Sequence, residues 1–128
     1  MKKTPSDKWQ DAVISYKKKC QSILKLSDHV RYAGVINAYG RTLTGIIKPN
    51  VKPLLKSEEI KNEFFIVSTL ISLRRASESE LGKLDYAILK HSKTHIAILH
   101  KNNVTFYVSI NPKEKNSEQL VSKIKKII

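Results

Sequence analysis

The segment VRYAGVINAYGRTLTG, residues 30–45, constrains the fold more than any other part of the chain. Two runs rich in β-branched and aromatic residues, 30–36 and 41–47, flank a turn with the sequence NAYG. Asparagine at the first position of such a turn and glycine at the fourth are typical of a type I turn with Gly40 in the left-handed conformation. The segment therefore predicts a β-hairpin.

Both faces of the first hairpin strand carry apolar residues, which predicts a sheet covered on both sides by other elements. Alternation along the strand places Ala33 and Val35 on one face, and on the other Val30, Tyr32, Gly34 and Ile36. Gly45 in the second strand predicts a bulge or a close approach of another segment. The glycines lack the spacing of a phosphate-binding loop or a dinucleotide-binding motif, so we interpret the hairpin as structural.

Three helices are predicted from capping residues and apolar stripes. Thr4 followed by Pro5 is typical of a helix start, and the apolar residues from Trp9 onward recur at spacings of three and four. A second helix is expected at 57–75, capped by Ser57, and a last one after a cap at Asn116. Alternating patterns between these two helices predict three strands, at 84–91, 94–99 and 104–110.

The middle helix is apolar over most of its circumference. Ile60, Phe64, Val67 and Ile71 form one stripe, and further apolar residues occupy much of the remaining surface: Phe65, Ile66, Leu70 and Leu73. One face of a sheet can cover only one side of a helix. We therefore expect a second surface to cover this helix.

Net charge is unevenly distributed. The chain carries a formal charge of +13, yet residues 57–82 contain five acidic and three basic residues. Such a balance favours an acidic partner, either nucleic acid, an anionic lipid surface or an acidic protein, or else a lysine-rich surface that is simply solvated. A single cysteine fits a reducing, cytoplasmic location. At 128 residues we expect one domain, 1–128, with residues 1–5 as a flexible N-terminus.

The order helix, two-strand hairpin, helix, three-strand meander, helix resembles the roadblock/LC7 family, a group of profilin-like α+β domains. The hairpin VRYAGVINAYGRTLTG is similar to the apolar, glycine-tipped first hairpin of that family, and the resemblance extends over residues 6–128. The chain looks most like uncharacterised small archaeal members. The resemblance implies a five-stranded antiparallel sheet with the middle helix on one face and the terminal helices on the other.

The same resemblance implies a function without an active site. Roadblock proteins act as scaffolds and as regulators of small Ras-like GTPases or motor complexes, and they dimerise through their middle helices and third strands. The corresponding dimer residues here are Ile66, Leu70, Tyr86 and Ile88. The residues expected to contact a protein partner are Phe65, Leu73, Arg74 and Arg75. We expect neither catalysis nor a cofactor.

A second hypothesis is binding of a polyanion such as nucleic acid. If the terminal helices are neighbours, they would present one lysine-rich face, made of Lys8, Lys17, Lys18, Lys25, Lys123, Lys125 and Lys126. Lysine supplies 20 of the 24 basic residues, and arginine, which reads bases and phosphates better, supplies only four. Basic strands interleaved with aromatic residues, which are typical of RNA-binding sheets, do not occur.

Cysteine and histidine provide the remaining chemical candidates. Cys20 lies on the apolar stripe of the first helix, which favours a buried, inert thiol over a nucleophile paired with histidine. His91, His95 and His100 lie close together along the meander, but no cysteine accompanies them and Asp85 is the only nearby acid. We therefore expect ordinary histidines and no metal site.

Overall fold

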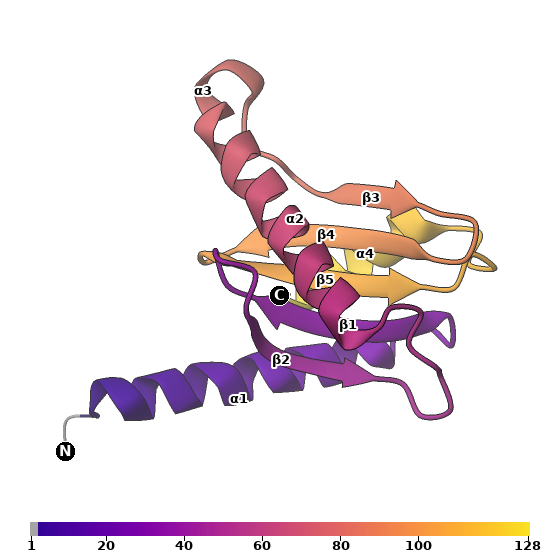
Figure 1. Ribbon diagram of the computed structural model, residues 1–128, viewed down its shortest axis with the longest axis horizontal. Helices are drawn as coiled ribbons and strands as arrows, with labels where there is room; N and C mark the ends of the chain where they lie inside the picture. Colours follow the sequence, from indigo (N-terminus) through magenta and orange to yellow (C-terminus); the bar gives the residue numbers. More distant parts are fainter. Residues whose placement is uncertain (1–2) are drawn as a thin grey trace.

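The computed structural model describes residues 3–128, and this part of the chain forms four helices and five strands (Figure 1). In chain order these are α1 (Pro5–Leu24), β1 (Val30–Ile36), β2 (Thr42–Ile47), α2 (Ser57–Ala76), α3 (Glu78–Leu81), β3 (Ala87–Lys90), β4 (His95–Lys101), β5 (Val104–Ile110) and α4 (Ser117–Ile127). The predicted order of three helices and five strands is confirmed. The short helix α3 is an addition.

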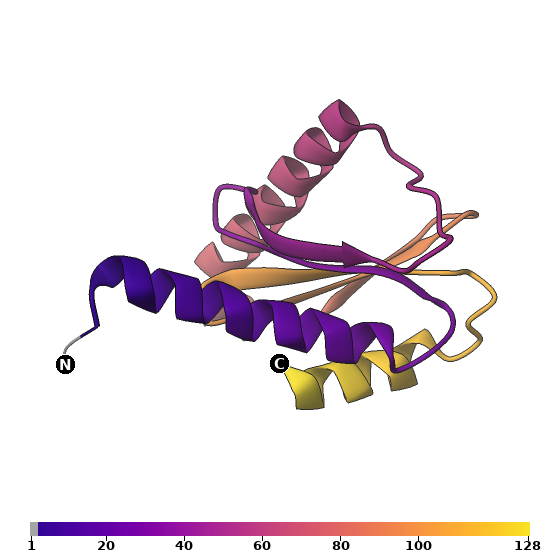
Figure 2. The same cartoon turned by 90° about the horizontal axis from the view of Figure 1, so that it is seen from below.

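The five strands form one antiparallel sheet in the order β2-β1-β5-β4-β3. Helices α1 and α4 lie together on one face of this sheet, and α2 crosses the other face alone (Figures 1 and 2). The predicted fold class, an α+β sheet with the middle helix on one side and the terminal helices on the other, is therefore confirmed. Strands β2 and β3 are the two edges.

Each face of the sheet has its own hydrophobic core. The core under α1 and α4 is the larger, and Phe106 at its centre meets the ring of Tyr16 edge-on, with ring centroids 6.0 Å apart. The core under α2 is smaller and includes Phe64, whose ring centroid lies 4.9 Å from that of Tyr107. Burial on both sides of β1, β4 and β5 explains why each of these strands carries apolar residues on both faces.

The face predicted for Val30 is wrong. Val30 belongs to the core under the terminal helices, together with Ala33 and Val35, and not to the α2 side with Tyr32. The cause is a register shift between β1 and β5, where Val30 pairs with Ile110 and Tyr32 with the adjacent Ser109. Such a bulge inserts one extra residue and reverses the alternation of side chains on its far side.

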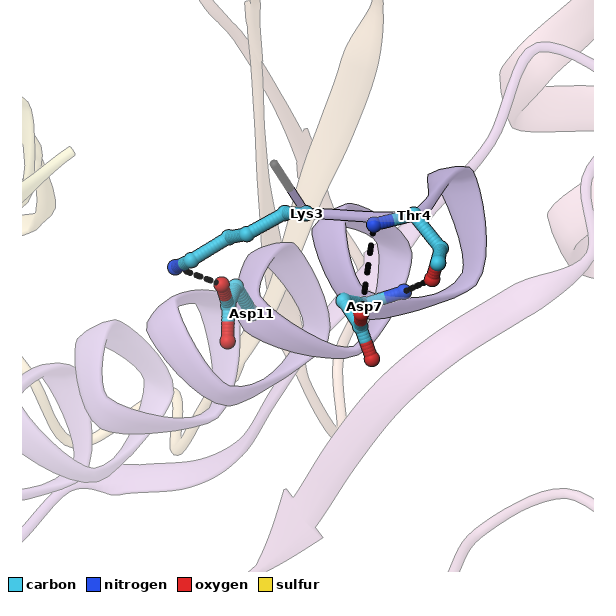
Figure 3. A network of polar contacts seen from close by, with 4 residues as sticks. All are labelled: Lys3, Thr4, Asp7 and Asp11. Carbon is cyan, nitrogen blue, oxygen red and sulfur yellow. Dashed lines mark hydrogen bonds and ion pairs between the residues drawn. The ribbon is translucent and has the colours of Figure 1, made fainter. Parts of the chain in front are cut away.

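The start of α1 is fixed by its first residues. Thr4 Oγ1 accepts a hydrogen bond from Asp7 N at 3.1 Å, and Asp7 Oδ2 accepts one from Thr4 N at 3.2 Å. Figure 3 shows this reciprocal cap beside an ion pair between Lys3 and Asp11. The predicted cap and Pro5 at the first helical position are confirmed. Of the segment 1–5 expected to be flexible, residues 1–2 lie outside the described residues.

Several boundaries differ from the predictions by one to three residues. Ser57 is the first residue of α2, and the cap is Lys56, whose N–H donates to Glu59 Oε1 at 3.0 Å. Strand β3 begins at Ala87 instead of residue 84, and residues 83–86 form an irregular connection after α3 and Gly82. Strand β4 continues to Lys101, since the two residues after it have positive φ, as in a tight two-residue hairpin turn: Asn102 and Asn103.

The hairpin glycines make room for one side chain and one helix. Gly34 and Gly45 are register partners, and a Cβ atom at either would lie within 2.3 Å of the Tyr32 hydroxyl. The close approach predicted at Gly45 is therefore the Tyr32 ring. Gly40 has φ of 81°, as predicted, and a Cβ there would lie 2.8 Å from the carbonyl oxygen of Phe64. The hairpin turn thus contacts the middle of α2.

Candidate functional site

Helix α2 has one apolar face turned toward the sheet and a second turned away from it. Phe64, Val67 and Ile71 are at most 5% exposed and contact the sheet. Phe65, Ile66 and Leu73 are each 61% exposed. Spacings of seven and eight residues place these three on the same side of the helix, which we call the outer face of α2.

Exposure of the outer face of α2 to water is energetically unfavourable. Single exposed apolar residues are common, but three large ones on one side of one helix are the kind of surface that marks an interaction site. Burying one such side chain completely is worth about 1.5–3 kcal/mol. The C-terminal part of α2 and α3 extend past the sheet edge (Figure 1), where Leu81 is a further apolar residue that is 67% exposed.

Strand β3 presents an open edge next to α2. It pairs only with β4 among the strands of residues 3–128, so one side of its backbone is available for a further strand. Its four residues alternate between the two faces. Ala87 and Leu89 pack against the core under α2, and Ile88 packs against the core under the terminal helices.

The four predicted dimer residues occupy two different faces. Ile66 is on the outer face of α2, and Leu70 lies beside it, partly buried. Tyr86 and Ile88 are partly buried against the core on the opposite side of the sheet. The structure therefore does not bring the two pairs together within one chain. Both pairs could lie in one dimer interface only if the β3 edges of two copies pair with each other. The two sheets would then be continuous, and both faces of the continuous sheet would be present where the copies meet.

The last turn of α2 carries Arg74 and Arg75, both exposed. Arg75 Nε lies 4.0 Å from Glu78 Oε1. The imidazole of His100, on β4, is nearby: its pKa is lowered, mainly by burial and also by the charge of Arg75, with Glu78 acting in the opposite direction. A cationic helix end beside an apolar patch suits a partner that presents carboxylates.

The lysines of the polyanion hypothesis lie on the far face of the sheet. All seven are exposed, and α1 and α4 are neighbours, as that hypothesis requires: Lys8, Lys17, Lys18, Lys25, Lys123, Lys125 and Lys126. However, the ammonium group of Lys125 is paired with Asp85 at 2.6 Å. The N-terminal half of α1 extends beyond the sheet, away from α4 (Figure 2), so the lysines do not form one compact site.

Cysteine and histidine do not combine into a reactive site in the described part of the chain. Cys20 is fully buried, and burial raises the pKa of its thiol to about 11, which disfavours the nucleophilic thiolate. His95 Nδ1 lies 3.3 Å from Ser117 Oγ, and His100 Nδ1 lies 3.4 Å from Thr105 Oγ1. No cluster of three or more side chains able to hold a metal ion occurs within residues 3–128.

Burial of Cys20 gives a direct prediction. In native buffer the thiol should react with a disulfide reagent at least ~1,000-fold more slowly than in denaturant, because reaction requires unfolding or a large opening. The measurement is thionitrobenzoate release, with a Cys20→Ala variant as the blank. Rapid release from the folded protein would show that the Cys20 side of α1 does not pack against the core.

A groove lies on the α2 side of the sheet, and sequence reasoning missed it. It has a volume of about 480 Å³ and is enclosed by the start of α2, the connection before it, the β3–β4 turn and the sheet. Its polar residues come from segments far apart in the sequence, among them Arg31, Lys52, Glu63 and Lys93. None of these segments carries a recognisable motif, so only the fold reveals the site.

Solved structures with the same arrangement of elements are known. The Roadblock/LC7 domain from Streptomyces avermitilis superposes with a TM-score of 0.66 at 12% sequence identity, covering 86% of this chain and 88% of that domain. The chain has the roadblock/LC7 fold. No protein-family model and no curated protein sequence matches it.

Two further solved structures are similar to this chain. The gliding protein MglB from Thermus thermophilus has a TM-score of 0.70 at 9% identity, with 90% of this chain and 86% of that one covered. Myxococcus xanthus MglB has a TM-score of 0.67 at 8% identity, with coverage of 99% and 89%. Within residues 3–128, no helix combines the length and apolar character needed to cross a bilayer.

Proposed function

We propose that this roadblock-fold chain is a single, non-enzymatic regulatory or scaffold domain of the cytoplasm that forms a homodimer and binds a protein partner. The observation that carries the proposal is the outer face of α2, with Phe65, Ile66 and Leu73 each 61% exposed. A helix that already contacts its own sheet on one side needs a second protein surface to cover the other.

Charge supports self-association through the same region. A second copy carries the same charge of +13, so contact between most surfaces would bring lysines together. Residues 57–82, which include α2 and α3, contain more acidic than basic residues and avoid this repulsion. An MglB structure described as having a tetrameric arrangement shares the fold at a TM-score of 0.64 and 11% identity, which is consistent with assembly by proteins of this fold.

The dimer and the partner can use different parts of α2. Helical geometry places Ile66 and Leu70 on one flank of the outer face and Phe65 on the other. We assign the first flank, with the β3 edge, to the second copy. The other flank and the C-terminal end, with Phe65, Leu73, Arg74 and Arg75, are assigned to the protein partner. The roadblock resemblance implies that this partner is a small Ras-like GTPase.

Binding to a GTPase is tested with a Ras-like GTPase from the same genome, loaded with GDP or with a non-hydrolysable GTP analogue. We expect binding that prefers one nucleotide state, and a loss of at least ~10-fold in affinity for Arg74→Glu, because arginine is over-represented among interface hot spots. Lys123→Glu, on α4, is the matched control. Failure to bind in both states would count against a GTPase partner and leave the dimer untouched.

A further inference from the structure

The groove beside α2 exists because one helix cannot cover a five-stranded sheet. Strands β1, β5 and β4 form its floor at the end of the sheet where α2 begins. Tyr32, Ile96 and Tyr107 of these strands line the groove. Ile60 and Phe64 of α2 form one wall, and the connection through Pro53 and Leu54 closes another. At about 480 Å³ the groove is within the range of roughly 300–1,000 Å³ typical of sites for small molecules.

Aromatic rings pack against one another on the floor and one wall of the groove. The rings of Tyr32 and Tyr107 meet edge-on with centroids 6.2 Å apart, and Phe64 contacts Tyr107 in the same way. Tyr107 donates its hydroxyl hydrogen to Glu63 Oε2 at 2.9 Å, which orients the only carboxylate that lines the groove within residues 3–128. Burial, followed by the neighbouring Glu63 charge, raises the pKa of Tyr107 well above its usual value. Tyr107 therefore remains a neutral donor to Glu63.

The rim of the groove is cationic. Arg31, Lys52 and Lys93 line it together with His91, and Glu63 supplies a carboxylate. Arg31 lies at the bulge in β1, between Val30 and Tyr32, and its side chain lines the groove. Arg31 Nη2 donates to the carbonyl oxygen of Lys52 at 2.9 Å, so the guanidinium is held close to the connection. Three permanent positive charges around an apolar floor complement a molecule with an apolar body and an anionic head.

We propose that this groove binds a small amphipathic anion, with its aliphatic or aromatic body on the floor formed by Tyr32, Ile96 and Tyr107 and its head between Arg31, Lys52 and Lys93. The head is a carboxylate or a phosphate monoester, since both accept hydrogen bonds from guanidinium and ammonium groups. This site is separate from the outer face of α2. It is present in a single chain and does not depend on dimerisation.

The test uses the full chain and the fluorescent probe 8-anilinonaphthalene-1-sulfonate, with uncharged N-phenyl-1-naphthylamine as its neutral counterpart. Reversing two rim charges, in Lys52→Glu with Lys93→Glu, should weaken binding of the sulfonate at least ~10-fold and leave the neutral probe within about twofold. Lys8→Glu with Lys126→Glu makes the same change in net charge far from the groove and should have little effect. Unchanged thermal unfolding would confirm that each variant is folded.

Two further arms make the outcome decisive. Ile60→Trp places an indole in the groove and should abolish binding of both probes, whereas Phe65→Glu on the outer face of α2 should not affect either. Displacement of the sulfonate by decanoate or by decyl phosphate, but not by decanol, would support an anionic head and show which kind is preferred. Equal loss in the rim and control variants, or loss only in Phe65→Glu, would overturn the proposal.

Discussion

A single glutamate on the outer face of α2, in Ile66→Glu, is expected to convert the proposed dimer to a monomer. Ile66 is 61% exposed in the single chain, so the substitution should leave the monomer fold intact. In the dimer it would bury an unpaired carboxylate against apolar side chains, which costs several kcal/mol. A penalty of about 3 kcal/mol raises the dimer dissociation constant ~100-fold. Light scattering across a concentration series measures the change.

The matched control for Ile66→Glu is Ile14→Glu on α1. Ile14 is 53% exposed, so both substitutions replace an exposed isoleucine with glutamate on a long helix. Only the variant on α2 should dissociate. Leu70→Glu should also dissociate the dimer, but Leu70 is partly buried in the monomer, so its unfolding free energy must be measured as well. A wild-type protein that is monomeric at tens of micromolar would remove the dimer proposal.

The layered fold could be predicted because its cause is local. Residues 30–36 are apolar on both faces, and that pattern alone requires layers on both sides of the sheet. The bulge near Val30 could not be predicted, because it depends on how β1 pairs with a strand more than 70 residues later in the chain. Helix α3 was missed for a different reason: at four residues it is too short to show an apolar period.

The candidate site was predictable only in part. Apolar residues around most of α2 indicated that a second surface contacts this helix. In the structure Phe64 and Val67 face the sheet, so Phe65 and Ile66, which face away, are available for that second surface. That choice depends on the rotation of the helix over the sheet, which no periodicity fixes when both faces are apolar. The groove was beyond prediction, because its rim combines charged residues from separate loops and strands that only the fold brings together.

The turn of the first hairpin should be sensitive to replacement of its glycine. Gly40→Ala is expected to lower the free energy of unfolding by about 3 kcal/mol, with about 1–2 kcal/mol from the positive φ and the rest from overpacking against α2. The overpacking is specific: a Cβ would lie 2.8 Å from the Phe64 carbonyl oxygen and 2.9 Å from Phe65 Cα, and backbone atoms of a helix cannot move aside easily. Chemical denaturation measures the loss.

Two comparisons separate backbone strain from contact with the helix. Gly82 has φ of 79°, nearly the same as the 81° of Gly40, but among the described residues no atom lies within 4 Å of a Cβ placed there. Gly82→Ala should therefore cost only the strain, about 1–2 kcal/mol. Gly40→Asn tests the overpacking against α2, because asparagine tolerates positive φ but still carries a Cβ. If Gly40→Asn is as stable as the wild type, the turn does not contact α2. The hairpin would then not help to fix which face of α2 points away from the sheet.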